Sequence, residues 1–176
     1  MKSNHRIFSF LILIIALSAS ISVYLPQGNV IIDQELPTSK INLAIINFFI
    51  MTIIYGGLGF VGMKLSNKIG FADIWNENIP LKKKIIQPLF IGIGLGIFFI
   101  MLDLVFSSFH SLGALPHPPF PLSLFASITA GIGEEIIVRL FFISFWVWLF
   151  SYIFFKKKYL KQTFWIDLFF LQYYLL

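Results

Sequence analysis

The chain has 176 residues, of which 58% are hydrophobic, 18% are aromatic and only 12% are charged. An average soluble domain is about 25% charged, so this composition excludes an ordinary soluble globule and predicts that lipid surrounds the chain. The chain contains no cysteine, which excludes disulfides and thiolate metal ligands.

Three apolar runs come close to the roughly 20 residues that a helix needs to cross a bilayer. We predict membrane spans near residues 7–25, 43–63 and 85–106. A fourth apolar region, residues 122–155, would extend about 50 Å as a straight helix, against a hydrocarbon core of about 30 Å. We therefore expect this region to cross the membrane once. A break, a tilt or an interfacial turn would account for its excess length. Residues 163–176 form a partial C-terminal segment that is too short for a span.

The first span has an alternative interpretation as a cleavable signal peptide. Lys2 and Arg6 form a basic start, an apolar stretch follows, and the small residues "ALSAS" come next, which is the order found in such peptides. A membrane anchor is favoured here, because the rest of the chain is also predicted to lie in the membrane.

The basic residues predict how the chain crosses the membrane. They gather before the first span, between the second and third spans, and after the fourth, whereas only Lys40 lies between the first two spans. Basic loops remain on the cytoplasmic side, so the N-terminus is predicted to be cytoplasmic. The formal net charge of +5 is thus a topology signal, and it gives no support for nucleic acid as a partner. The sequence predicts an all-α, polytopic transmembrane helix bundle with about four crossings, formed by one domain of residues 1–176.

The stretch "GIGEEIIVRLFF", residues 131–142, places three ionisable side chains inside the fourth apolar region. Each one costs at least ~2.5 kcal/mol at the centre of a membrane helix, so such residues normally face a cavity or a partner. Glu135 and Arg139 are four positions apart and are predicted to form an ion pair. Glu134 is turned by about 100° from Glu135 and has no cation at that spacing.

Small residues accompany these charges at helical spacing. Ala126 and Ala130 lead to Glu134, and Ser123, Ser127 and Gly131 lead to Glu135. We expect both acids to project from faces that another helix can approach closely, and we expect Gly131 and Gly133 to permit a break just before them. Glycines in the second and third spans are also predicted to allow close helix packing; they are Gly56, Gly57, Gly59, Gly62, Gly92, Gly94 and Gly96.

Spacing alone leaves three interpretations of the charged group open. It is a buried network that holds helices together, a relay for protons or ions, or a catalytic site in which one carboxylate is neutralised and the other is available. A small ion-coupled transporter would use the second of these. The absence of an inverted sequence repeat argues against a transporter.

The motif "EEIIVR", residues 134–139, resembles the EExxxR motif of the CAAX-protease and bacteriocin-processing (CPBP, or Abi) family of intramembrane proteases. The order of the chain is similar too, since several spans precede the motif. The resemblance implies that Glu134 activates water as a general base, that Glu135 supports the site, and that Arg139 holds a carboxylate in place. It also implies the cell membrane as the location, and either zinc as a cofactor or histidines alone as the groups that assist Glu134. The substrate that it implies is a membrane-associated peptide, CAAX-like or bacteriocin-like.

The chain departs from the family pattern at several points. Val138 and Leu140 stand where the family often has Phe and Gly, and the two later histidine motifs of the family are missing. The histidines of the chain are His5, His110 and His117, all of which precede the acidic pair. The zinc ligands that the family would use are therefore not present in this chain, and we interpret His110 and His117 as ordinary loop residues.

Three functions follow as hypotheses. The first is a CPBP-type intramembrane endopeptidase, inactive here if the chain is a truncated family member. The second is a non-catalytic membrane protein, such as a bacteriocin immunity or binding factor or an inert remnant. The third is the ion-coupled transporter.

Overall fold

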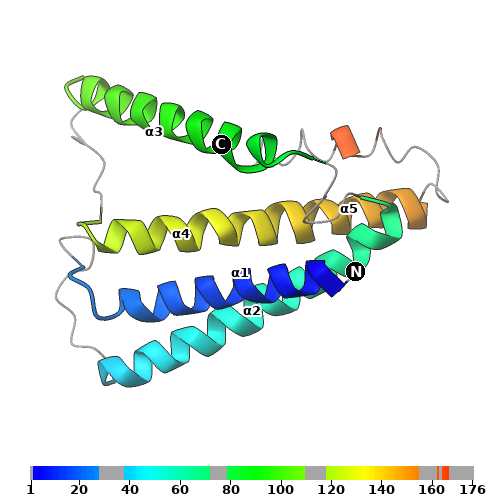
Figure 1. Cartoon of the computed structure of the whole chain (residues 1–176), viewed down its shortest axis with the longest axis horizontal. Helices are drawn as coiled ribbons and strands as arrows, with labels where there is room; N and C mark the ends of the chain where they lie inside the picture. The colour runs from blue at the N-terminus through cyan, green and yellow to red at the C-terminus, as the bar shows by residue number, and fades with distance from the viewer. Residues whose placement is uncertain are drawn as a thin grey trace. The chain divides into compact units, whose positions relative to one another are not determined.

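The computed structural model describes residues 2–27, 38–71, 79–109, 118–154, 162 and 164–166. Within these ranges the chain is helical and contains no strand, which confirms the predicted all-α fold class (Figure 1). Four helical segments of the described chain are long and apolar enough to cross a membrane. They are Asn4–Ser22, Lys40–Ile69, Lys82–Phe106 and Leu122–Ile153.

The described chain divides into two compact units. The first unit contains α1 (Lys2–Ser22), α2 (Lys40–Ile69) and the helical run that starts at Leu122. The second unit contains a short π-helix, η2 (Lys82–Ile86), and α3 (Gln87–Phe106). The single domain stays a prediction.

Local capping explains why α2 is longer than the predicted span at residues 43–63. The Ser39 side chain accepts a hydrogen bond from the backbone N–H of Asn42 at 3.3 Å, which satisfies one of the free donors of the first turn. The helix ends at Gly70, whose φ of 73° lies in the left-handed region that glycine adopts without strain. Both ends are therefore determined by residues outside the apolar run.

The fourth membrane-length segment is one continuous helical run with a changing hydrogen-bond pattern. It consists of α4 (Leu122–Glu134), the π-helix η3 (Glu135–Ile143), α5 (Ser144–Trp148) and the π-helix η4 (Leu149–Phe154). The expected break is absent, because the helical run continues without a gap from Leu122 to Phe154. At Glu135 the hydrogen-bond pattern changes from α to π. The partial segment predicted at residues 163–176 lies mostly outside the described residues.

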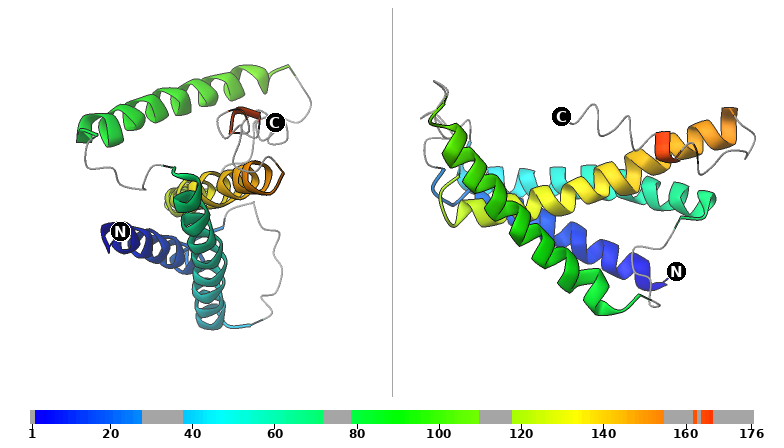
Figure 2. Two further views of the ribbon diagram at one scale, coloured as in Figure 1. Left: turned by 90° about the vertical axis from the view of Figure 1, so that its right-hand side faces the viewer. Right: turned by 90° about the horizontal axis from the view of Figure 1, so that it is seen from above.

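The helices of the first unit pack around two apolar clusters. α1 packs on α2 and α4, while α2 also packs on η3 and α5. Figure 2 shows the yellow-to-orange run crossing the cyan α2. The first cluster contains Phe8, Ile12, Ile15, Met63 and Ile136, and the second contains Ile69, Ile143 and Val147. These clusters place η3 against α2 on one side and leave its other side uncovered by α1 and α2.

Two glycines of α2 allow this close packing. A Cβ added at Gly62 would lie 2.6 Å from the backbone oxygen of Leu140, and one at Gly59 would lie 2.5 Å from the ring of Phe8. A Cβ at Gly57 would meet nothing within 4 Å. The prediction of close packing is therefore confirmed for Gly59 and Gly62, and the structure gives no such role to Gly57.

Candidate functional site

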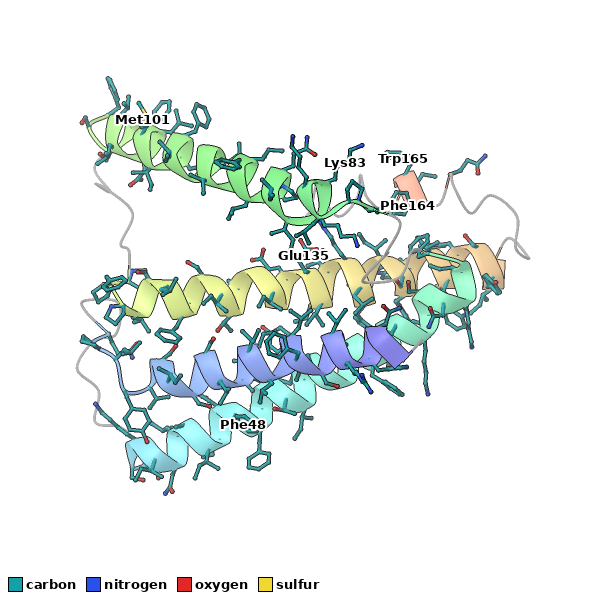
Figure 3. The ribbon with its side chains drawn as sticks, viewed as in Figure 1. Phe48, Lys83, Met101, Glu135, Phe164 and Trp165 are labelled. Carbon is teal, nitrogen blue, oxygen red and sulfur yellow. The ribbon has the colours of Figure 1, made fainter. Side chains whose placement is uncertain are left out.

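The acidic pair lies at the junction between α4 and η3. Glu134 is the last residue of α4, Glu135 is the first residue of η3, and Arg139 lies within η3. All three side chains are exposed. Figure 3 shows Glu135 projecting from the helix away from α1 and α2. The site therefore occupies the side of this helix that those two helices do not cover, near the middle of the segment Leu122–Ile153.

The structure confirms the predicted ion pair. The Nη1 atom of Arg139 lies 3.2 Å from the Oε2 atom of Glu135, and the two side chains are 72% and 56% exposed, respectively. Within the described ranges, Glu134 has no ion-pair partner. One carboxylate is thus neutralised by a cation on the same helix, and the adjacent one is not.

The faces that carry the two acids are open, and no described helix of the first unit lies against them. Ser127, Ala130 and Gly131 are exposed, and a Cβ at Gly131 would meet nothing within 4 Å. The close contact occurs instead at Gly133, where an added Cβ would lie 2.6 Å from the ring of Tyr55 on α2. The glycine nearest the acids therefore serves packing, while the small residues that lead up to them line an open face.

The π-helix at the site is a feature that sequence reasoning missed. Hydrogen bonds in a π-helix join residues five apart, and such segments frequently occur at functional sites. The α-helical spacing of 3.6 residues per turn applies to α4 and not to η3. No local sequence signal marks the change. The π-helical segment η3 is, however, the one whose backbone at Leu140 lies against Gly62 of α2.

The described residues do not fit a zinc site. They contain no group of three or more His, Cys, Asp or Glu side chains arranged to hold a metal ion. The site offers two adjacent carboxylates, one of which is paired with Arg139, whereas catalytic zinc usually requires three protein ligands. His5 is exposed on α1, and His110 and His117 lie outside the described residues. We therefore derive no catalytic step through a metal.

Comparison of the chain with protein-family models, with curated proteins and with solved structures finds no match. The resemblance to the CPBP family consequently depends on the motif at residues 134–139 and on the order of spans before it. Any function assigned to the chain must be argued from the chemistry of these residues.

Proposed function

We propose that the chain is an intramembrane endopeptidase of the CPBP type in which Glu134 is the general base. The observation that carries this proposal is the asymmetry of the two adjacent acids. Arg139 neutralises Glu135 at 3.2 Å, while Glu134 stands beside this pair on the uncovered face of a membrane-length helix. A carboxylate without a cation partner is free to accept a proton.

The reaction is hydrolysis of a peptide bond at the level of the membrane. Glu134 accepts a hydrogen bond from water and removes its proton as the water oxygen attacks the peptide carbonyl carbon. The carbon–nitrogen bond then breaks, and the proton passes from Glu134 to the leaving amine. The products are a carboxylic acid and an amine, so the atoms of water and substrate balance.

The Glu135–Arg139 pair has a supporting role in this proposal. The negative oxygen that develops during attack requires a hydrogen-bond donor. A guanidinium has five N–H donors, and Arg139 directs one nitrogen toward Glu135, so further donors are available to that oxygen. Glu135 holds the guanidinium in place and balances its charge.

The substrate class and the location follow from the same resemblance. A membrane-associated peptide, either prenylated and CAAX-like or bacteriocin-like, is the proposed substrate. The proposed location is the cell membrane with the N-terminus in the cytoplasm, as the distribution of lysines between the membrane segments predicts.

The test is peptide cleavage by the full chain in liposomes, measured by mass spectrometry in ¹⁸O-labelled water. Hydrolysis of the peptide bond incorporates one ¹⁸O atom into the new carboxylate, which distinguishes cleavage by the chain from peptide already present. Glu134→Gln should lower the rate by roughly 10²- to 10⁴-fold, the usual contribution of a general base. Asp103→Asn, which removes a carboxylate from α3, is the matched control and should leave the rate unchanged. Cleavage by the Glu134→Gln variant at the unaltered rate would refute the role of this residue.

One observation favours a second candidate, a non-catalytic immunity or binding protein. The structure as described brings no imidazole and no third acid to the two carboxylates. Protection of cells against a bacteriocin by a chain that cleaves no peptide, and that still protects as Glu134→Gln, would support this candidate over the endopeptidase.

A further inference from the structure

The C-terminal end of α2 carries two cations outside the site described above. Lys64 and Lys68 are four positions apart and therefore lie on one face of the helix. Both are exposed, and no ion pair joins either one to an acidic side chain of the described residues. These two ammonium groups are therefore available to an anionic ligand.

An aromatic ring lies close to the ammonium group of each lysine. The Nζ atom of Lys64 lies 4.4 Å from the ring centroid of Phe60, and that of Lys68 lies 5.9 Å from the ring centroid of Trp148. The hydroxyl of Tyr152 donates a hydrogen bond to the backbone oxygen of Lys68. Trp and Tyr are enriched where a membrane meets water, because each has an apolar ring and a polar tip. This combination indicates the headgroup level of a bilayer.

The length of α2 supports this placement. A straight helix of 30 residues extends about 45 Å, which exceeds the roughly 30 Å of a hydrocarbon core. Lys40 begins the helix, and Lys64 follows about 36 Å further along it. The two ends of α2 are thus far enough apart to reach opposite membrane–water interfaces. The end that carries Lys64 and Lys68 lies at one of them.

We infer that Lys64 and Lys68, together with Trp148 and Tyr152, form a binding site for the headgroup of an anionic phospholipid. The ammonium groups pair with the phosphate, and the two aromatic rings hold the glycerol region beside the apolar cluster of Ile69, Ile143 and Val147. A lysine near an anionic membrane surface contributes about fivefold in affinity. The pair should therefore prefer an anionic over a zwitterionic lipid by on the order of 10- to 30-fold.

The experiment measures quenching of Trp148 fluorescence by brominated lipids in nanodiscs. The chain has four tryptophans, and the other three are replaced by Phe. Brominated phosphatidylglycerol should quench at a 10- to 30-fold lower mole fraction than brominated phosphatidylcholine. The double variant K64Q/K68Q should lose this preference, and K64R/K68R should keep it and show that the fold persists. Lys40→Gln, at the opposite end of α2, is the control and should leave the preference unchanged.

Three results would overturn the inference. The first is equal quenching by the two lipids in the unaltered lysine background. The second is an equal loss of preference in Lys40→Gln, which would indicate a general charge effect. The third is displacement of brominated phosphatidylglycerol from phosphatidylcholine nanodiscs by free glycerol phosphate. Such displacement would assign the site to a soluble phosphate, whereas a lipid site should show none.

Discussion

Replacement of Gly62 by alanine tests the closest helix contact in the structure. The new Cβ would lie 2.6 Å from the Leu140 oxygen and 2.8 Å from the Cα of Phe141. Ordinary contact begins at 3.4 Å, so α2 and η3 would have to separate by up to about 0.8 Å. Overpacking of this kind costs ~1–3 kcal/mol, because backbone atoms cannot rotate away as a side chain can.

The matched control is Gly57→Ala in the same helix. Both substitutions gain up to ~1 kcal/mol from the better helix propensity of alanine, but a Cβ at Gly57 meets nothing within 4 Å. The free energy of unfolding of Gly62→Ala should therefore lie ~1–3 kcal/mol below that of Gly57→Ala. The measurement is reversible unfolding in mixed micelles with dodecyl sulfate, followed by circular dichroism. Equal stability of the two variants would refute the contact between α2 and η3.

A second comparison separates backbone from side-chain contacts. At Gly59 the obstacles to a Cβ are side-chain atoms of Phe8 and Ile136, so Phe8→Leu should recover part of the stability that Gly59→Ala loses. At Gly62 the obstacle is backbone, so Leu140→Ala should recover none of the stability that Gly62→Ala loses. Recovery by Leu140→Ala would show that the helices touch through side chains at this point.

Three further predictions concern the packing of Gly133 and the hydroxyl groups of two serines. Gly133→Ala should destabilise the chain by ~1 kcal/mol or more relative to Gly131→Ala, because only the first places a Cβ against an aromatic ring; equal unfolding in the same micelles would contradict this. Ser151→Ala should be neutral or stabilising, by up to ~1–3 kcal/mol, because the Oγ of Ser151 is buried without a hydrogen-bond partner in the described structure. Ser20→Ala should cost ~0.5–1.5 kcal/mol, because the hydroxyl of Ser20 lies within hydrogen-bond distance of the backbone oxygens of Ala16 and Ala44, at 2.8 and 2.9 Å. A larger loss of stability in Ser151→Ala than in Ser20→Ala would contradict this reasoning.

Several features could be predicted from the sequence because they depend on local properties of the chain. Runs of apolar residues predict the four membrane-length helices. This prediction does not depend on which helices lie next to one another. The Glu135–Arg139 pair follows from a spacing of four positions on one helix. This pair forms at 3.2 Å although the segment is π-helical, because residues four apart on a helical run remain neighbours there.

The remaining features depend on which helices meet, and only the tertiary structure decided them. Gly57 and Gly62 are both glycines in one apolar helix, but only Gly62 lies against another backbone. Likewise Gly133 packs on α2 while Gly131, two positions earlier, does not. The switch to π-helix at Glu135 likewise has no local sequence marker. Apolar residues lie on most faces of these helices, so composition predicts that they enter the membrane. Only contacts between helices determine which face each one buries.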